Sequence, residues 1–131
     1  MSDAQKQADK AVLERMFEGF NRHDADAVMA CMTDDVVFET VAGSEAHGTR
    51  IEGRDAVRAA FEGVWTAMPD ARWEVSRHTA AGDLGVSEWT FSGTDKEGRR
   101  TEAQGCDLFA FRDGKAAHKR AFRKQRPTFQ A

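Results

Sequence analysis

The sequence predicts an α+β fold in which three helices pack on one curved antiparallel sheet. Up to Pro69, most apolar residues recur with helical spacing, whereas from Ala71 onward they follow the two-residue period of strands. Short turns that contain glycine separate four strand-like stretches in this second part. Helices followed by hairpin-linked strands are typical of α+β proteins, with the helices on one face of the sheet.

Three helices are expected in the first part of the chain, up to Pro69. Residues 8–20 have the three-and-four spacing of an amphipathic helix, and Asp24 is placed to cap a second, shorter helix. The third helix starts at Gly53-Arg54-Asp55, and Pro69 ends it. The side chains expected to be buried are Leu13, Met16, Phe17 and Phe20 in the first helix and Phe61, Val64 and Trp65 in the third.

The expected strands begin with a β-branched run, residues 36–41. Turns at Gly82-Asp83, at residues 95–98 and at Asp113-Gly114 then divide the second part of the chain into an antiparallel meander. The four strands of that meander are expected at residues 71–80, 84–93, 99–111 and 115–124.

Length and composition limit the classes of protein to consider. The 131 residues fit a single domain, 1–131, with a net charge of −3 and no apolar run of the roughly 20 residues that cross a membrane. The first seven residues lack the order of a secretory signal, so we expect a cytoplasmic protein with no membrane partner. Cys31 and Cys106 lack zinc or redox spacing, and the four histidines are scattered. We therefore expect no metal and no cofactor.

Basic residues gather near the end of the chain, because all 22 acidic residues precede Lys115. Nucleic-acid binding is one explanation, but the rest of the chain is acidic, and no aromatic platform or recognisable module accompanies the basic residues. We therefore expect no nucleic-acid partner. The basic residues of this stretch are Lys115, Lys119, Arg120, Arg123, Lys124 and Arg126.

One carboxylate stands out in the apolar stretch of residues 105–115. Because strand side chains alternate, Asp107 shares a face with Phe109 and Phe111, and the opposite face is also mostly apolar. Burying an unpaired charge is costly, and the group then neutralises or finds a partner. Either Asp107 reaches solvent at a frayed strand end, or it is paired, or it serves the function.

Four short motifs carry a family resemblance along nearly the whole chain. They are Phe20-Asn21 with Asp24, Asp34-Asp35-Val36, Gly53-Arg54-Asp55-Ala56-Val57, and residues 107–115. In this order they resemble the nuclear transport factor two superfamily, and within it the SnoaL-like polyketide cyclases and ketosteroid isomerases. The resemblance implies a single SnoaL-like domain, a cone-like, cystatin-like α+β barrel whose sheet and three helices enclose an apolar pocket.

The resemblance also assigns candidate site residues. Asp107 matches the protonated aspartate of the ketosteroid isomerases, but Thr40 stands where their general base lies and Met16 where their tyrosine lies, so their mechanism is not expected. His47 is a further candidate for proton transfer at the pocket mouth, or else a solvated loop residue. The residues expected to contact a ligand are Met16, Phe20, Phe38, Thr40, Trp65, Phe109, Lys119 and Arg123.

The position of Lys119 and Arg123 depends on strand register. Aligned with the family at the Asp-Gly-Lys turn, both face the pocket, where they can pair with Asp107 or bind an anionic group, but a one-residue slip would turn both to solvent. Glu39 is expected on the opposite face in a surface or interface ion pair, with catalysis as the alternative.

Two functions remain open. The first is a cofactor-free acid–base enzyme of the isomerase, cyclase or dehydratase type, with Asp107 as acid or base and Lys119 or Arg123 stabilising negative charge. The second is a non-catalytic small-molecule-binding or assembly module. In either case a homodimer is expected through the outer sheet face that carries Cys106, Leu108 and Ala110.

Overall fold

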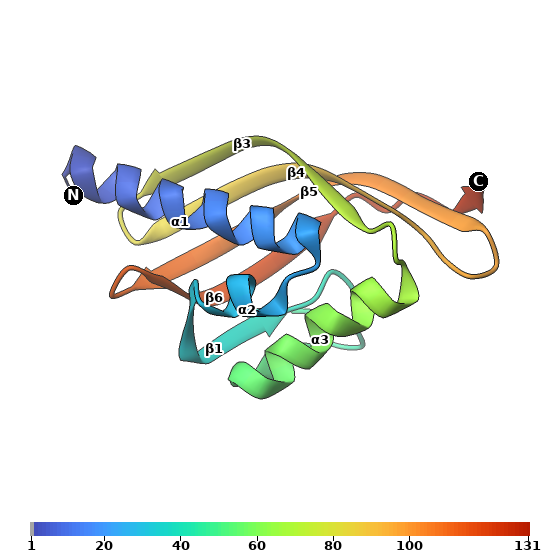
Figure 1. The fold of residues 1–131 in the computed structure, drawn as a ribbon, viewed down its shortest axis with the longest axis horizontal. Helices are drawn as coiled ribbons and strands as arrows, with labels where there is room; N and C mark the ends of the chain where they lie inside the picture. The colour runs from blue at the N-terminus through green and yellow to red at the C-terminus, as the bar shows by residue number, and fades with distance from the viewer. Residues whose placement is uncertain (1) are drawn as a thin grey trace.

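The computed structural model describes residues 2–131, which form three helices and a seven-stranded sheet. The helices lie together on one side of the sheet (Figure 1). In chain order the elements are α1 (Asp3–Arg22), α2 (Ala25–Met29), β1 (Met32–Glu39), β2 (Arg50–Glu52), α3 (Arg54–Ala67), β3 (Arg72–Ala81), β4 (Leu84–Thr94), β5 (Arg99–Arg112), β6 (Lys115–Arg123) and β7 (Phe129–Gln130).

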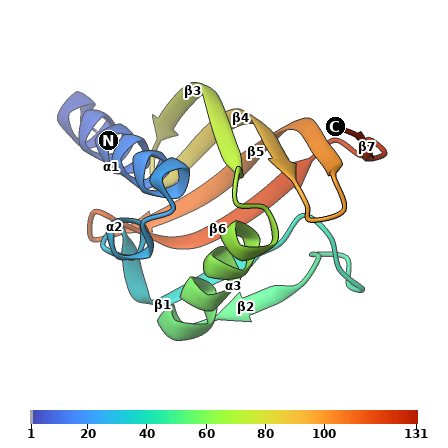
Figure 2. The ribbon, with the colours of Figure 1, turned by 45° about the vertical axis from the view of Figure 1, so that its right-hand side comes forward.

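The sheet has the strand order β2-β1-β6-β5-β4-β3, and β7 pairs with β5. Strands β3 to β6 form the expected antiparallel meander. The sheet is antiparallel as expected except at one pairing, because β1 runs parallel to β6. The chain leaves β1 through β2 and α3, enters the sheet again at the far edge, and returns strand by strand to β1. The sheet curves around the helices but does not close into a barrel (Figure 2).

The helices pack as their sequences predict, although α1 begins at Asp3, five residues before the predicted start. Ser2 and Asp24 cap α1 and α2 by accepting hydrogen bonds from backbone N–H groups of the first turn. The four expected core residues of α1 are buried, and so are Phe61 and Trp65 of α3, while Val64 is partly buried. Within residues 2–131, no helix is both long enough and apolar enough to cross a membrane.

Strand β1 begins four residues before the predicted start and ends two residues before the predicted end. Its start is fixed by β6, since Met32 pairs with Ala116 and the Ala116 N–H donates to the Cys31 carbonyl at 2.9 Å. Its end is fixed by Thr40, whose hydroxyl donates to the Ala42 carbonyl at 2.6 Å and turns the chain. Side-chain and cross-strand contacts therefore override the β-branched pattern here.

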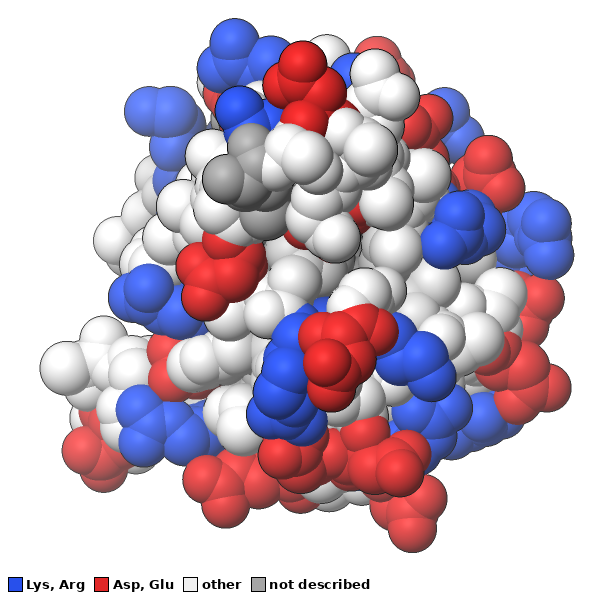
Figure 3. Space-filling model, turned by 90° about the vertical axis from the view of Figure 1, so that its left-hand side faces the viewer, with Lys and Arg blue, Asp and Glu red and all other residues white. Residues whose placement is uncertain are grey.

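Charges of both signs are interspersed on the molecular face shown in Figure 3, the left-hand side of Figure 1. Surface ion pairs accompany such a distribution, for example between Arg58 Nη1 and Asp26 Oδ1 at 2.7 Å. An exposed pair of this kind contributes about 0–1 kcal/mol to stability. The apolar core, rather than the surface charges, therefore positions the helices and strands relative to one another.

Candidate functional site

Asp107 lies buried on the concave face of β5, where two neighbouring strands supply hydrogen-bond donors to its carboxylate. Lys119 Nζ on β6 donates to Oδ1 at 3.1 Å, and Trp89 Nε1 on β4 donates to Oδ2 at 3.0 Å. Asp107 is 0% exposed and Lys119 is 5% exposed. Asp107 therefore does not reach solvent at a frayed strand end, and it is paired.

A bulge in β6 brings Lys119 to the face of Asp107. Phe111 pairs with Ala116, but Ala110 pairs with His118, so Ala117 is an extra residue on β6. Without it, simple hairpin pairing would place Lys119 on the convex face. With it, Lys119 pairs with Phe109 and lies diagonally across from Asp107, which matches the register expected from the family turn.

Glycine makes room for the second donor. Trp89 pairs with Gly105, and a Cβ atom added to Gly105 would lie 2.6 Å from Cη2 of the Trp89 ring. The ring lies over the glycine and reaches the carboxylate two residues further along β5. Trp89 was not among the expected site residues, although strand alternation within 84–94 would have placed it on the concave face.

Three aromatic rings surround the ammonium group of Lys119. Its Nζ lies 4.5 Å from the centroid of the Phe38 ring, 5.4 Å from that of Phe20 and 5.7 Å from that of Phe61. Cations are attracted to aromatic faces at such distances. Phe20 and Phe61 are buried, whereas Phe38 is only partly buried. Phe38 is thus the ring nearest to the ammonium and also the most accessible of the three.

The interior changes the acidity of the site. Burial raises the pKa of the Asp107 carboxyl, and it outweighs the Lys119 ammonium and the Trp89 N–H, which favour the ionised form. A carboxyl group with a raised pKa gives up and takes back a proton closer to neutral pH than an exposed aspartate does. The arrangement is therefore suited to acid–base chemistry.

The other expected ligand contacts lie at different depths. Met16 and Phe109 are buried in the apolar core, and Trp65 is buried with its ring stacked on that of His23, with 5.2 Å between the ring centroids. Arg123 ends β6 with its guanidinium carbon 5.4 Å from the centroid of the Phe91 ring. Arg123 is an exposed residue, so the two candidate cations of β6 lie one in the interior and one toward solvent.

Thr40 and His47 are not drawn into the Asp107 cluster. The Thr40 hydroxyl also accepts a hydrogen bond from the Thr49 N–H at 3.1 Å, so it holds the turn after β1. His47 lies within that turn, next to a bridge between Glu45 and Gly48. Across residues 2–131, no hydrogen bond, ion pair or ring contact joins His47 to Asp107. A role for His47 in proton transfer stays a prediction.

Glu39 occupies the convex side of the sheet in an ion-pair cluster, as the alternation of β1 predicts. Its three basic partners are Arg50 at 3.0 Å, the His118 imidazole at 3.3 Å and Arg120 at 3.4 Å. Burial alone would raise the pKa of Glu39, but the Arg50 hydrogen bond and the His118 contact outweigh it and lower the pKa.

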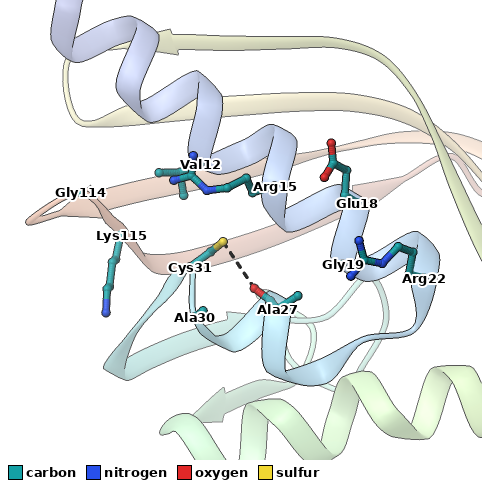
Figure 4. Close-up of a pocket in the computed structure, with 10 residues that line it drawn as sticks. All are labelled: Val12, Arg15, Glu18, Gly19, Arg22, Ala27, Ala30, Cys31, Gly114 and Lys115. Atoms are coloured by element: carbon teal, nitrogen blue, oxygen red, sulfur yellow. Dashed lines mark hydrogen bonds between the residues drawn. The ribbon is translucent and has the colours of Figure 1, made fainter.

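The hollows of the surface lie away from this cluster. One of about 400 Å³ opens between α1, α2 and the β5–β6 turn, with Cys31 in its floor (Figure 4). The Cys31 thiol donates to the Ala27 carbonyl at 3.6 Å, and burial raises its pKa, so it is not an activated nucleophile. Asp107 and Lys119 do not line this hollow or any of four other prominent hollows of the described residues.

Within residues 2–131, no three or more His, Cys, Asp or Glu side chains are grouped so as to hold a metal ion. The groups that hydrogen bonds join at the site are a carboxylate, an ammonium and an indole.

An open, curved sheet wrapped around three helices defines the cystatin-like class of α+β proteins, and solved structures of that class resemble this chain. The chain belongs to the family of the SnoaL-like domain, whose model matches residues 13–119. No curated protein matches the sequence significantly.

Several solved structures share the fold over most of the chain. Bal32a, from a soil-derived mobile gene cassette, is 15% identical with a TM-score of 0.83, covering 92% of each chain. An LEH-like epoxide hydrolase of M. tuberculosis is 18% identical with a TM-score of 0.75, covering 91% of this chain and 84% of that one. A putative polyketide cyclase of Xanthomonas campestris pv. campestris is 23% identical with a TM-score of 0.72, covering 90% and 91%. Similarity at these identities establishes the fold, which hosts more than one activity.

Proposed function

We propose that this chain is a cofactor-free acid–base enzyme for a small carbonyl-bearing or anionic molecule, with Asp107 as its proton-transferring group. One observation carries the proposal: a fully buried carboxylate has an ammonium and an indole as its donors in an aromatic interior. A buried ion pair is often no more stabilising than apolar residues of the same volume. Function accounts for this pair better than folding does.

Each group has a role in this reaction. The Asp107 carboxylate removes a proton from the carbon next to the ligand's carbonyl group, and the resulting negative charge on the ligand oxygen is stabilised by the Lys119 ammonium. While Lys119 pairs with Asp107, it favours the ionised base. When Lys119 turns to the ligand, burial favours the protonated form, and Asp107 returns the proton as an acid.

Access to this site is proposed to run past Phe38. The ring of Phe38 is the least buried of the three around the Lys119 ammonium, so its displacement exposes the cation at the smallest cost in buried area. Arg123 lies four residues further along β6, about 13 Å away at the rise of a strand. A guanidinium can bind a ligand carboxylate through two hydrogen bonds. The preferred ligand therefore has an apolar body and oxygen groups at its ends.

Deuterium exchange of 2-tetralone tests the enzyme directly, because it reports proton removal next to a carbonyl group and needs no cofactor. The protein is expected to speed exchange of the α-protons in D₂O, and Asp107→Asn is expected to slow it by about 10²-fold or more. Glu39→Gln is the matched control, since it neutralises a carboxylate on the opposite face. Equal rates for Asp107→Asn and the unmodified protein would reject the proposed enzyme.

A non-catalytic binding module is the second candidate. It is favoured by the fact that both Asp107 oxygens already accept hydrogen bonds while three rings cover Lys119. The two candidates differ in one outcome. Binding of 2-naphthoate that Lys119→Met weakens at least ten-fold, without any exchange of 2-tetralone, would support the module.

We also propose a homodimer through the convex sheet face. Leu84 and Phe122 on that face are 44% and 45% exposed, and Phe122 pairs with Cys106. A second copy of the face would cover this apolar surface. Sedimentation at micromolar concentration should give a dimer that Phe122→Lys dissociates, whereas an unmodified protein that sediments as a monomer would reject the interface.

A further inference from the structure

A row of polar side chains crosses the concave face of the sheet and ends at Asp107. His78 on β3 pairs with Ser87 on β4, and Ser87 pairs directly with Asp107 on β5. The His78 imidazole is hydrogen-bonded to the Ser87 hydroxyl, with 2.8 Å between Nδ1 and Oγ. Residues directly opposite in antiparallel strands have Cβ atoms about 4.5–5.5 Å apart. Ser87 is therefore a cross-strand neighbour of the buried carboxylate, while its hydroxyl is hydrogen-bonded to His78 and the Asp107 oxygens accept from Trp89 and Lys119.

A bulge in β3 turns His78 to this face. Val75 pairs with Trp89, but Arg77 pairs with Glu88, so Ser76 is an extra residue on β3. Val75 and His78 both face the helices as a result, although they are three residues apart. Simple alternation from Val75 would have turned Arg77 inward instead.

The two ends of the row differ in access. Ser87 is 0% exposed, like Asp107, whereas His78 is partly buried with its ring 5.3 Å from that of Phe17 on α1. His78 also lines a hollow of about 450 Å³ between α1 and β3. The other polar side chains around this hollow are Glu14, Glu18, Asn21 and Arg22. One end of the row thus reaches the surface, and the other is the sealed Asp107 site.

The hydroxyl of Ser87 can act in either direction. A serine hydroxyl donates one proton and accepts others. When His78 Nδ1 is unprotonated, Ser87 donates to it; when Nδ1 carries a proton, the imidazole donates to Ser87 Oγ. The hydroxyl proton is then free to point to Asp107 on the same face.

We propose that His78 is a positioning residue for the Asp107 site and that, through Ser87, it delivers and withdraws the proton that Asp107 exchanges with the ligand. In the delivering step, the Nδ1–H bond breaks as a Ser87 O–H bond forms, and the original Ser87 O–H bond breaks as an O–H bond forms on Asp107. The reverse step restores every group, so atoms and charge balance without a co-reactant. The inference rests on the proposed acid–base function and names the route by which its proton reaches solvent.

The charged groups around the row suit such a transfer. Burial lowers the pKa of His78, with Glu14 opposing and Lys10 adding to the effect, both from α1. Burial raises the pKa of Asp107 against the effect of Lys119 from β6. The two pKa values therefore move toward each other, and groups of similar acidity exchange a proton at low cost.

The Trp89 indole provides the readout, because its N–H donates to Asp107 and its ¹⁵N signal reports the state of that carboxyl. We would follow this signal and the His78 ring signals by NMR across roughly pH 4 to 8, the range in which histidine titrates. The Trp89 signal of the unmodified protein is expected to show a step at the His78 midpoint. Ser87→Ala should shrink the step at least three-fold while His78 still titrates, and Ser87→Thr should restore it.

Two histidine variants complete the design. His78→Asn keeps a hydrogen-bonding group near Ser87 but does not titrate, so the step should vanish. His23→Asn is the matched control, since His23 bonds the Ala71 carbonyl and is outside the row, and the step should stay. A Trp89 signal that is flat through the His78 titration, or a step of unchanged size in Ser87→Ala, overturns the inference. The 2-tetralone test of Asp107 does not depend on either result. If the protein fails to exchange the protons of 2-tetralone but the step in the Trp89 signal is intact, only the proposed enzyme is rejected.

Discussion

Asp107 and Glu39 are both buried carboxylates of one sheet, yet they lie on opposite faces and have different surroundings. Asp107 faces the helices, where one cation and one indole donate to it. Glu39 faces away from the helices. Its partners are three side chains with part of their surface in solvent, Arg50, His118 and Arg120.

The difference supports the proposal that Glu39 is a structural charge and Asp107 a functional one. Around Glu39, cations that keep part of their hydration lower the pKa and hold the carboxylate ionised. Around Asp107, burial dominates and raises the pKa. Surface ion pairing explains Glu39 in full, whereas Asp107 and Lys119 carry a desolvation cost that the fold alone does not require.

Removing Lys119 should have the largest effect on stability. Lys119→Met leaves Asp107 without its cation in the interior, and losing one partner of a buried pair costs about 3–5 kcal/mol. Urea unfolding near pH 7 measures this cost. Arg120→Met, the next residue on the opposite face, should cost about 1 kcal/mol or less. Equal costs for both variants would remove the distinction between the two faces.

Removing the indole donor should have an intermediate effect. Trp89→Phe keeps the aromatic bulk but deletes the N–H that donates to Asp107, and losing a hydrogen bond to a charged group costs about 1.5–3 kcal/mol. The same change should raise the pKa of Asp107 further, because the lost bond favours the ionised form. The pKa of Asp107 in Trp89→Phe can be measured by ¹³C NMR titration of its carboxyl group. A pKa no higher than in the unmodified protein would mean that the indole does not stabilise the carboxylate.

The two carboxylates should respond oppositely to pH. The pKa of Asp107 is raised above its ordinary value of 3.8. The folded state therefore binds the proton more tightly than the unfolded state, and stability relative to Asp107→Asn should fall as the pH rises through the raised pKa. The pKa of Glu39 is lowered from 4.5, so its contribution should be present above that pH and be lost as the pH falls. The measurement is the free energy of unfolding of Asp107→Asn and of Glu39→Gln across this pH range, each relative to the unmodified protein. If the two differences change with pH in the same direction, the comparison of the two carboxylates is wrong.

Weakening the Glu39 cluster should have the smallest effect. Glu39→Gln should cost about 1 kcal/mol near neutral pH, since its partners reach solvent. The cost should shrink in about 1 M salt, where charges are screened within about 3 Å. A cost that is independent of salt would place Glu39 among the desolvated groups with Asp107.

Much of this fold could be predicted from local patterns. The buried faces of α1 and α3, the caps at Ser2 and Asp24 and the meander of β3 to β6 all depend on neighbouring residues. Of these, the cap at Asp24 and the buried faces were named from the sequence. The parallel pairing of β1 with β6 was not predicted, because it joins segments about 80 residues apart and no local pattern encodes it.

The site was predictable to a lesser extent. Asp107 was conspicuous as a charge in an apolar strand, and the family turn placed Lys119 on its face. Bulges at Ser76 and Ala117 decide which side chains of β3 and β6 face inward, and strand alternation alone cannot locate them. For this reason His78 was not connected with Asp107 in the sequence analysis.

The central claim is that the buried pair serves function rather than stability, and exchange of 2-tetralone by one double variant tests it most directly. Asp107→Leu with Lys119→Met replaces the pair by apolar side chains, which is often neutral or stabilising by about 1–4 kcal/mol. We predict that this variant unfolds at the same or a higher urea concentration than the unmodified protein and exchanges the α-protons at the rate of buffer. A folded double variant that exchanges them as fast as the unmodified protein would contradict the claim.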